Sequence, residues 1–473
     1  MNKIRTFEII TLGCKVNEYE TRYYQEQLEK LGLIEIHRDS EDEFNSNSSN
    51  LNHSLNEKNE RSESEADVVI INTCTVTNTA AAKSRKKIRK ARKENPEAIV
   101  VIVGCYAQVV EPSIAEGLQA DLILGSSHKS EFGAWIEKLM NQRGWMSDES
   151  NGIESKERKL HFEVSPIEDI SDFDNMPIGH FEHQHRAFLK IQDGCNQYCA
   201  YCQIPLARGP ERSQIPAEVI KTARSLTETG HLELVLTGIH TGRYSFRKTN
   251  LSMLLSMLLE ETDENVTFRI SSIEITEVTD ELLDLMAQNP RILPHLHIPI
   301  QAGSDETLAR MKRPYTVEQF KKRVSEIRKK VPDISISTDV ITGFVQESDE
   351  EFAQTVKNLE EIGFSFLHVF PYSRRKGSAA DKMSGFIDAA VAKKRTHELL
   401  KLSDQLRQND MKRFKTSEIL LERPENNHPD IMLGYTKQYH PAKVLHPVQT
   451  SGRIEVKILG IEDGVFICEE IQR

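Results

Sequence analysis

The sequence has no long hydrophobic stretch. It begins MNKIRTFEII, without the apolar segment of a secretory signal peptide. No uninterrupted apolar run approaches the roughly 20 residues that a membrane-spanning helix needs. We therefore expect a cytoplasmic protein that does not contact a membrane.

Cysteine is scarce, with seven residues in a chain of 473. In a reducing cytosol, we expect these cysteines to serve metal or redox chemistry rather than disulfides. At about 150 residues per domain, the length suggests about three domains, which is ample for a sizeable core.

An excess of positive charge is also lacking. The formal net charge is −11, so the overall field repels phosphate, and a nucleic-acid partner would need local basic patches. One such patch is KSRKKIRKARK, residues 83–93, in which eight of eleven side chains are basic. As a helix it would place four lysines on one face: Lys83, Lys86, Lys87 and Lys90. The alternative is a merely solvated cationic face, and we favour contact with phosphate.

Three cysteines lie close together in KIQDGCNQYCAYCQIP. Cys195, Cys199 and Cys202 have the spacing CxxxCxxC. A [4Fe–4S] cluster usually takes four cysteines, so three leave one iron open to a molecule other than protein. The alternatives are buried free cysteines or a zinc site, but zinc usually needs four ligands, and no second close pair lies nearby. The loop resembles the signature of the radical S-adenosylmethionine (SAM) enzymes, in which the open iron binds SAM.

Three apolar segments near the beginning of the chain each end in a turn that contains a cysteine. They are FEIITLGCKVN with Cys14, DVVIINTCTVT with Cys74 and IVVIVGCYAQ with Cys105. Continuous β-branched runs are typical of strands buried on both faces, and the intervening helix-like stretches predict a doubly wound parallel sheet. Sites in such sheets form beyond the carboxyl ends of the strands. One cysteine there is usually a buried core residue, but three in equivalent positions predict a second metal site.

The rest of the chain divides by composition. Within an N-terminal domain (1–145), residues 38–66 are polar, acidic and rich in Asn and Ser, which predicts a disordered insertion. Residues 146–180 have the character of a linker. Six strand-like segments alternate with helices over 181–410, as in an open parallel β/α barrel, whose functional residues lie at the carboxyl ends of the strands. Short alternating strands over 411–473 predict a small β-barrel, with Cys468 in its core.

Several motifs are spread over nearly the whole chain outside 38–66: TLGCKVNEYET, INTCTVTNTAAAKSRK, VGCYAQ, AFLKIQDGCNQYCAYC, RGPERS, LTGIHTGRYS, HLHIPIQAGSDETLARMKRPYT and HVFPYSRRKGS. In these motifs the chain resembles the methylthiotransferase family of radical SAM enzymes. The tail with LGYTKQY resembles a TRAM domain, a small RNA-binding β-barrel. GCKVN and HVFPYSRRKG are most similar to the MtaB-type branch.

The resemblance implies an α/β enzyme that modifies tRNA. The MtaB-type branch replaces the hydrogen on adenine C2 of N6-threonylcarbamoyladenosine, at tRNA position 37, with a methylthio group. The implied cofactors are two [4Fe–4S] clusters and two SAM molecules per turnover, one for the methyl group and one for the radical. The implied partners are a tRNA anticodon stem-loop, an electron donor such as a flavodoxin or ferredoxin, and a sulfur source.

Two kinds of alternative stay open. The same chemistry could act on isopentenyl-modified adenosine in tRNA or on an aspartate of a ribosomal protein. A different class altogether would be a non-catalytic iron–sulfur protein that binds RNA as a redox sensor.

The family's functional positions carry over residue by residue. The SAM cluster would use Cys195, Cys199 and Cys202, and an auxiliary cluster would use Cys14, Cys74 and Cys105. The expected SAM contacts are Tyr201, Glu233, Arg269, Ser271, Ser272 and Gln301. Further expected RNA contacts are Arg208, Arg212, Arg374, Arg375 and Lys376.

Four positions depart from the family pattern. Ile275 stands where we expect a proline, and His185 where relatives often have a threonine. Val345 and Gln346 replace the Pro and Gly of a GFPGE-like turn. None of these is a cysteine, so the departures bear on loop geometry and substrate fit rather than on the class of reaction.

Overall fold

A computed structural model describes residues 5–36, 65–146, 159–181, 185–426 and 428–471. Nearly all of the insertion predicted at 38–66 therefore lies outside the described residues. The chain forms two compact units. The first comprises Met1–Ile178, Asp193–Gln197 and Cys202–Arg212, and the second comprises Gly179–Gln192, Tyr198–Tyr201 and Ser213–Arg473.

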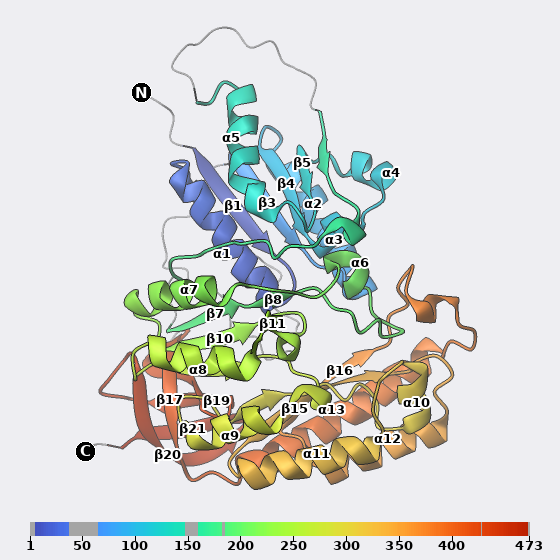
Figure 1. Ribbon diagram of the computed structural model, residues 1–473, viewed down its shortest axis with the longest axis vertical. Coiled ribbons are helices and arrows are strands. Elements are labelled where there is room, and N and C mark those ends of the chain that lie inside the picture. Colours follow the sequence, from blue (N-terminus) through green and yellow to red (C-terminus); the bar gives the residue numbers. More distant parts are fainter. Residues whose placement is uncertain (1–4, 37–64, 147–158, 182–184, 427, 472–473) are drawn as a thin grey trace. The chain divides into compact units, whose positions relative to one another are not determined.

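The first unit is built on a six-stranded parallel sheet with helices on both faces (Figure 1). Its strand order is β2-β1-β3-β4-β5-β6. The strands are β1 (Thr6–Thr11), β2 (Ile34–Glu35), β3 (Val68–Thr73), β4 (Ile99–Gly104), β5 (Leu122–Leu124) and β6 (His161–Glu163). Strands β3 and β4 are buried along their whole length, as their β-branched sequences require. The prediction of a doubly wound parallel sheet is confirmed.

The helices of this unit are α1 (Lys15–Lys30), α2 (Asn78–Glu94), α3 (Cys105–Val109), α4 (Pro112–Ala115), α5 (Phe132–Gln142) and α6 (Ile204–Arg208). Thr77 caps the beginning of α2, because its side chain accepts a hydrogen bond from the Ala80 backbone amide. The helix buries Ser84, Ile88 and Ala91 on its inner face. Its cationic face is therefore left to the outside.

The second unit contains six parallel strands in two linked sheets. One sheet has the order β13-β10-β7 and the other β14-β15-β16, and a bridge between Ser272 and His297 joins them. The strands are β7 (Arg186–Lys190), β10 (Glu233–Thr237), β13 (Thr267–Ile270), β14 (His295–His297), β15 (Ser335–Thr342) and β16 (Phe366–Pro371). All six strands lie within 181–410, where strand-like segments alternate with helices, so the open β/α barrel is confirmed.

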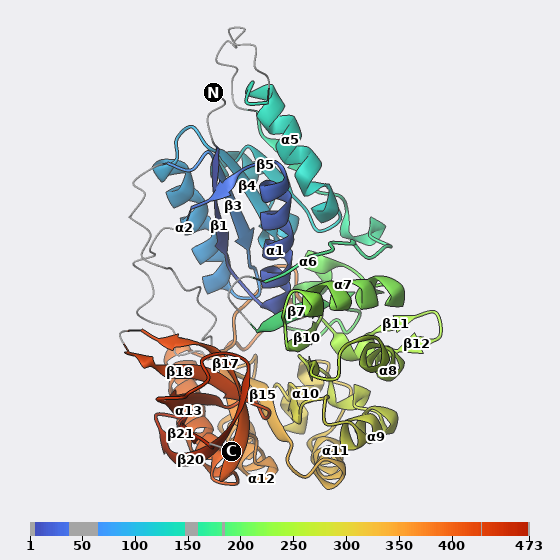
Figure 2. The ribbon, with the colours of Figure 1, turned by 90° about the vertical axis from the view of Figure 1, so that its left-hand side faces the viewer.

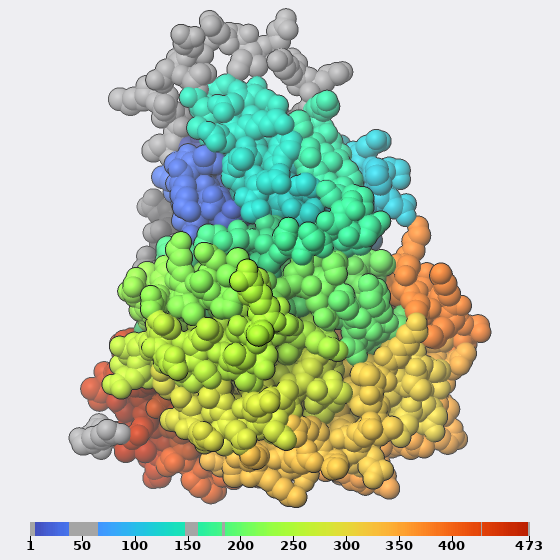
Figure 3. Space-filling model, viewed as in Figure 1, coloured from blue at the N-terminus to red at the C-terminus, as the bar shows by residue number. Residues whose placement is uncertain are grey.

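Helices follow these strands and cover the outer face of the barrel. They are α7 (Pro216–Glu228), α8 (Leu251–Glu261), α9 (Asp280–Gln288), α10 (Asp305–Arg310), α11 (Val317–Lys330), α12 (Asp349–Ile362) and α13 (Ala389–Met411). The space-filling view shows the surface that α8, α9 and α11 form over the strands (Figure 3).

The chain ends in a closed five-stranded barrel with the order β17-β18-β19-β21-β20, drawn in red in Figure 2. Its strands are β17 (Thr416–Glu425), β18 (His428–Thr436), β19 (Pro441–Leu445), β20 (Arg453–Glu462) and β21 (Val465–Glu470). Cys468 is fully buried in its core beside residues such as Ile419 and Val444, as predicted. Among the described residues, no helix is long and apolar enough to cross a membrane.

Candidate iron–sulfur sites

Three cysteines of the first unit stand directly beyond neighbouring parallel strands. Cys14 follows β1 and precedes α1, Cys74 follows β3, and Cys105 follows β4 and is the first residue of α3. Gly104, with φ of 87°, makes the last turn possible, because a Cβ there would lie 2.5 Å from the Thr73 carbonyl oxygen. The sheet topology thus brings the three thiols to one edge.

The pKa of Cys74 is affected by burial and by neighbouring ionisable groups. Burial raises the pKa of Cys74 to about 12, with contributions of the same sign from Cys105 and Cys14, whereas Arg208 acts in the opposite direction. Thiols must lose their protons to bind metal, so these cysteines need a strong cationic centre among them. Three converging sulfur ligands fit a [4Fe–4S] cluster with one open iron.

Arg208 is a cation in hydrogen-bond contact with one of these cysteines. Its guanidinium is 1% exposed, and its Nε donates to Cys105 Sγ at 3.2 Å. Its Nη1 donates to Glu20 at 2.9 Å and to Asp193 at 3.1 Å, and its Nη2 donates to Asn17 at 3.1 Å. Asn17 in turn accepts from the Cys14 thiol at 3.5 Å. Arg208 therefore links the ligand set to buried carboxylates.

This placement corrects an expectation for RGPERS. Arg208 is buried among protein groups and is not available to phosphate. Arg212 is 6% exposed and donates to the carbonyl oxygens of Arg208 and Pro210 at 2.9 and 2.7 Å. Both guanidinium groups are therefore occupied by protein partners rather than presented to RNA.

The CxxxCxxC loop is shaped by a glycine and by backbone amides. Gly194 has φ of 74°, and a Cβ there would lie 1.9 Å from the Pro210 carbonyl oxygen. The amides of Gln197 and Ile204 each donate at 3.4 Å to a sulfur, of Cys195 and Cys202 respectively. Hydrogen bonds of this kind stabilise thiolate and tune a cluster.

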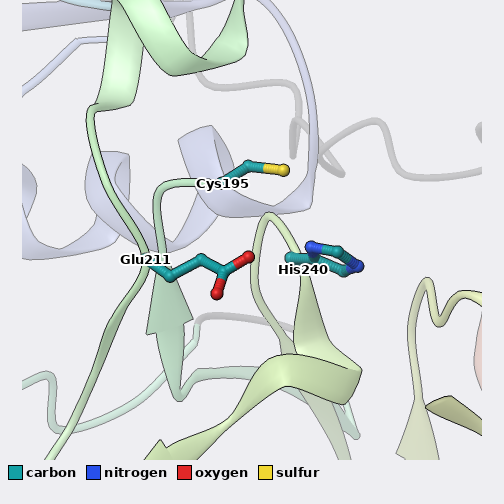
Figure 4. A group of neighbouring side chains, drawn as sticks. All are labelled: Cys195, Glu211 and His240. Atoms are coloured by element: carbon teal, nitrogen blue, oxygen red, sulfur yellow. The ribbon is translucent and has the colours of Figure 1, made fainter. Parts of the chain in front are cut away.

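A carboxylate of the first unit lies beside Cys195 in this loop. The Glu211 carboxylate accepts from the Asn196 amide at 3.1 Å, and Figure 4 shows Cys195 and Glu211 on neighbouring segments of the first unit. His240, drawn in the same view, belongs to the second unit, where it follows β10.

Cys199 and Tyr201 belong to the second unit. Arg313 donates from Nη1 to Cys199 Sγ at 3.3 Å and also pairs with Glu274. The Tyr201 ring packs edge-on against Phe344, with centroids 6.4 Å apart. Arg313 is a buried cation beside a cysteine, much as Arg208 is in the first unit, and sequence reasoning missed it.

Three of the expected SAM contacts lie where a barrel enzyme binds its ligands. Ser271 and Ser272 follow β13, and Ser271 Oγ lies 3.1 Å from Thr241 Oγ1. Gln301 follows β14, and its amide donates to the Asp339 carbonyl oxygen at 2.9 Å. Their position agrees with the rule for barrel strands, and their contact with SAM stays a prediction.

Glu233 lies at the other end of the strands, and the guanidinium of Arg269, the third of the four residues of β13, reaches it. Glu233 is the first residue of β10 and is paired with Arg269 at 2.7 Å and with Arg186 at 3.3 Å. Arg269 also donates to the Lys437 carbonyl oxygen at 3.0 Å and packs 4.6 Å from the centre of the Tyr439 ring. These residues attach the C-terminal barrel to the β/α barrel. The expectation that they bind SAM is therefore replaced by a structural role.

A polar cluster inside the β/α barrel escaped sequence reasoning. His297 Nε2 lies 3.3 Å from Asp339 Oδ1, its Nδ1 lies 3.0 Å from Ser337 Oγ, and its ring is 5.3 Å from that of His368. Burial opposes ionisation of Asp339, but His297 lowers its pKa. The signal was the two-residue period of HLH and SISTD, which points these side chains to one face.

The remaining basic candidates differ in exposure. Lys83, Lys86 and Lys90 are exposed on α2, and Lys87 is half-buried. Arg374 is exposed and pairs with Asp381 at 2.6 Å, Lys376 is exposed, and Arg375 is buried. Arg375 is thus also removed from the candidate RNA contacts.

Comparison with known proteins decides the family. The model described as "Radical SAM superfamily" matches residues 189–359, and "Uncharacterized protein family UPF0004" matches residues 38–125. A protein of Bacillus subtilis named threonylcarbamoyladenosine tRNA methylthiotransferase MtaB is 36% identical, over 95% of this chain and 92% of its own. The chain belongs to the MtaB-type radical SAM tRNA methylthiotransferases. Membership in this family implies SAM and a [4Fe–4S] cluster.

Other relatives of this methylthiotransferase carry related names. A Thermotoga maritima protein named MtaB is 32% identical over 83% of this chain and 80% of its own. A Thermodesulfovibrio yellowstonii protein named tRNA-2-methylthio-N(6)-dimethylallyladenosine synthase is 30% identical over 96% of each chain. The solved radical SAM methyltransferase TsrM of Kitasatospora setae, at 16% identity, has a TM-score of 0.51 over 79% of this chain and 76% of its own, which shows likeness of fold alone.

Proposed function

We propose that this methylthiotransferase converts N6-threonylcarbamoyladenosine at tRNA position 37 to its 2-methylthio derivative. The observation that supports sulfur insertion best is the convergence of Cys14, Cys74 and Cys105 at one sheet edge, around Arg208. The names of the Bacillus and Thermotoga relatives support the choice of nucleoside.

Two cofactor sites follow from this proposal. Cys195, Cys199 and Cys202 hold one [4Fe–4S] cluster, and Cys14, Cys74 and Cys105 hold the auxiliary one. When bound, the first supplies the electron that cleaves SAM to a 5′-deoxyadenosyl radical, and a second SAM provides the methyl group. The domain boundaries predicted at 145, 180 and 410, the external electron donor, the sulfur source and the cytoplasmic location belong to the same proposal.

The protein's own residues have three tasks in this reaction. Amide and guanidinium donors at the sulfurs stabilise the thiolate ligands, as Arg208 does at Cys105 and Arg313 at Cys199. Tyr201, Ser271, Ser272 and Gln301 position SAM. The β/α barrel shields the reacting carbon from water, because a radical of this reactivity would otherwise be quenched.

Nucleoside analysis of tRNA from a deletion strain tests the substrate. We expect threonylcarbamoyladenosine to persist without its methylthio group and to regain it when the gene is restored. If instead the isopentenyl nucleoside alone loses its methylthio group, the activity named for the Thermodesulfovibrio relative is the correct one. If neither nucleoside changes, the protein does not act on tRNA position 37.

Cys199→Ala separates an enzyme from a redox sensor. We expect this variant to form no 5′-deoxyadenosine while it still binds tRNA.

Iron and acid-labile sulfide, measured beside a Cys14/Cys74/Cys105 triple-alanine variant, test the second cluster. About eight irons per chain should fall to about four, and about four in both proteins would exclude the auxiliary cluster.

A further inference from the structure

The end of β16 and the connection that follows it to α13 present aromatic rings to solvent. Phe370 is 46% exposed and Phe386 is 40% exposed. Between them in sequence, Tyr372 is half-buried, and its ring lies nearly parallel to that of Phe386, at 7° and 6.5 Å between centroids. The guanidinium of Arg374 lies 4.6 Å from the centre of the Phe386 ring. Exposed aromatic rings beside cations mark an interaction surface rather than a core.

The surroundings hold this arrangement in place. The backbone amide of Gln346 donates to the Gly385 carbonyl oxygen at 2.8 Å, and its side-chain Nε2 donates to the Ser384 carbonyl oxygen at 2.9 Å. Gln346 has φ of 62°, a left-handed conformation that glycine adopts more readily. This departure from the family turn therefore adds a side-chain bond to the segment just before Phe386. Arg374 is oriented by its bond to Asp381.

A row of rings leads from this surface to the cluster loop. Phe386 is followed by Tyr372, then by Phe344 at 5.1 Å and by Tyr201 at 6.4 Å between centroids. Tyr201 lies between Cys199 and Cys202, and all four rings belong to the second unit. The Tyr372 hydroxyl is buried and has no hydrogen-bond partner among the described residues. A buried donor without a partner costs free energy, and an acceptor on a bound molecule would satisfy it.

The charge of the segment selects an anionic occupant. Residues 370–394 contain six Lys or Arg and two Asp side chains, in a chain of net charge −11. An acidic protein would need only the charges, whereas unpaired RNA bases use both features, because bases stack on aromatic rings and on arginine while phosphates contact cations. The observations therefore favour RNA over an acidic electron donor.

We propose that Tyr372, Arg374 and Phe386 form a stacking platform for unpaired nucleobases that flank the target nucleotide of the RNA. This inference rests on the proposed function, because it assumes a tRNA substrate. It assigns to the platform the loop bases next to position 37, while the target base itself goes to the cluster loop. Lys376 and Lys382 supply phosphate contacts at its margin.

The test is binding of an anticodon stem-loop RNA to the reconstituted full-length protein. A threonylcarbamoyladenosine stem-loop with 2-aminopurine next to position 37 reports both affinity and stacking. We expect Phe386→Ala to raise Kd by roughly 5- to 100-fold and to abolish the quenching of 2-aminopurine. Phe386→Trp should retain both properties.

Phe246→Ala is the matched control. Phe246, in the β11–β12 hairpin (Ser245–Phe246 and Thr249–Asn250), also has an arginine over its ring, since Arg247 lies 5.5 Å from the ring centre. It is not joined to the row of rings, so its removal should leave Kd unchanged. Iron content and circular dichroism of each variant confirm that it is folded and loaded.

The outcomes separate the inference from the proposed function. Failure of the wild-type protein to bind any anticodon stem-loop would overturn the proposed function. Binding by the wild type with unchanged Kd and quenching in Phe386→Ala would overturn the platform alone. Unchanged RNA binding with loss of cluster reduction by flavodoxin would also overturn it and would make this surface the docking site of the electron donor.

Discussion

At the scale of single residues, Arg208 holds several buried partners together. It is buried with Glu20, Asp193 and Lys129, and Lys129 Nζ lies 2.7 Å from the Glu20 carboxylate. The desolvation of these charges is large, so their pairing does not by itself show a net gain in stability. Removing one partner, by contrast, lowers the stability strongly, because it leaves a buried charge uncompensated.

Arg208→Gln should therefore lower the free energy of unfolding by about 3–5 kcal/mol. Arg208→Lys retains the charge but loses the fork of donors to Cys105 and Asn17, and we expect a smaller loss. Urea unfolding of the two variants beside the wild type measures both. A Gln variant within about 1 kcal/mol of wild type would show that Glu20 and Asp193 find other partners.

Gly194 is a second residue whose substitution has a specific result. Gly194→Ala brings a methyl group against the Pro210 carbonyl oxygen in a left-handed conformation, so the CxxxCxxC loop cannot keep its shape. We expect the reconstituted variant to lose about four irons per chain while keeping those of the Cys14 set.

Gly230→Ala is the control for backbone strain alone. Gly230 has φ of 98°, and a Cβ there meets no atom within 4 Å. Its iron content should match that of the wild type. If both alanine variants lose iron equally, positive φ rather than the clash at Gly194 is responsible.

At the level of elements, α2 is the clearest candidate for RNA contact outside the barrel. Its buried face fixes its orientation, and Lys83, Lys86 and Lys90 are exposed on the other side. Each phosphate contact contributes roughly 0.7–0.9 to the slope of log K against log salt. Replacing these three lysines by Gln should thus lower the slope for tRNA binding by about 2 to 3.

A helix of similar charge provides the comparison. Replacing Lys322, Lys329 and Lys330 of α11 by Gln removes the same charge from another exposed cationic helix. An equal fall in slope for both triple variants would mean that the effect is one of net charge, not of contact through α2.

The elements were largely predictable, because their causes are local. Buried β-branched runs and period-two segments predicted the strands, and the meeting of parallel strand ends predicted that Cys14, Cys74 and Cys105 converge. The prediction that Glu233 contacts SAM was wrong because the segment LELVLTG does not reveal which residue begins the strand. The start of the strand is set by its pairing with β7 and β13. The prediction that Arg208 contacts RNA was wrong because its partner Glu20 is 188 residues away in the sequence. The local sequence around a buried arginine does not differ from that around an exposed one.

At the scale of the second unit, buried ion pairs join the C-terminal barrel to the β/α barrel. Arg186 lies between Glu233 and Glu422, while Asp410 accepts from His440 at 2.9 Å across a second contact. The C-terminal barrel core also includes Met411, the last residue of α13, and the titratable groups among these polar contacts make the attachment sensitive to acid.

Glu233 gives this attachment a defined dependence on pH. Burial opposes its ionisation, but Arg269 and Arg186 outweigh burial and lower its pKa from an ordinary 4.5 to about 2. A depressed pKa means that the stabilisation is complete above pH 4.5 and is lost as pH falls toward 2. The full effect is on the order of 3 kcal/mol, reduced by Glu422, whose pKa is raised by burial.

Glu233→Gln removes the titrating group and keeps its shape. We expect the variant to be less stable than the wild type at neutral pH and to show a flatter loss of stability between pH 4.5 and 2. Urea unfolding across this range, with the variant beside the wild type, measures the difference. Parallel curves for the two proteins would show that another group causes the acid sensitivity. The Asp410–His440 pair would then be the first to replace. Burial raises the pKa of Asp410, whereas its hydrogen bond with His440 contributes to the lowered pKa that results.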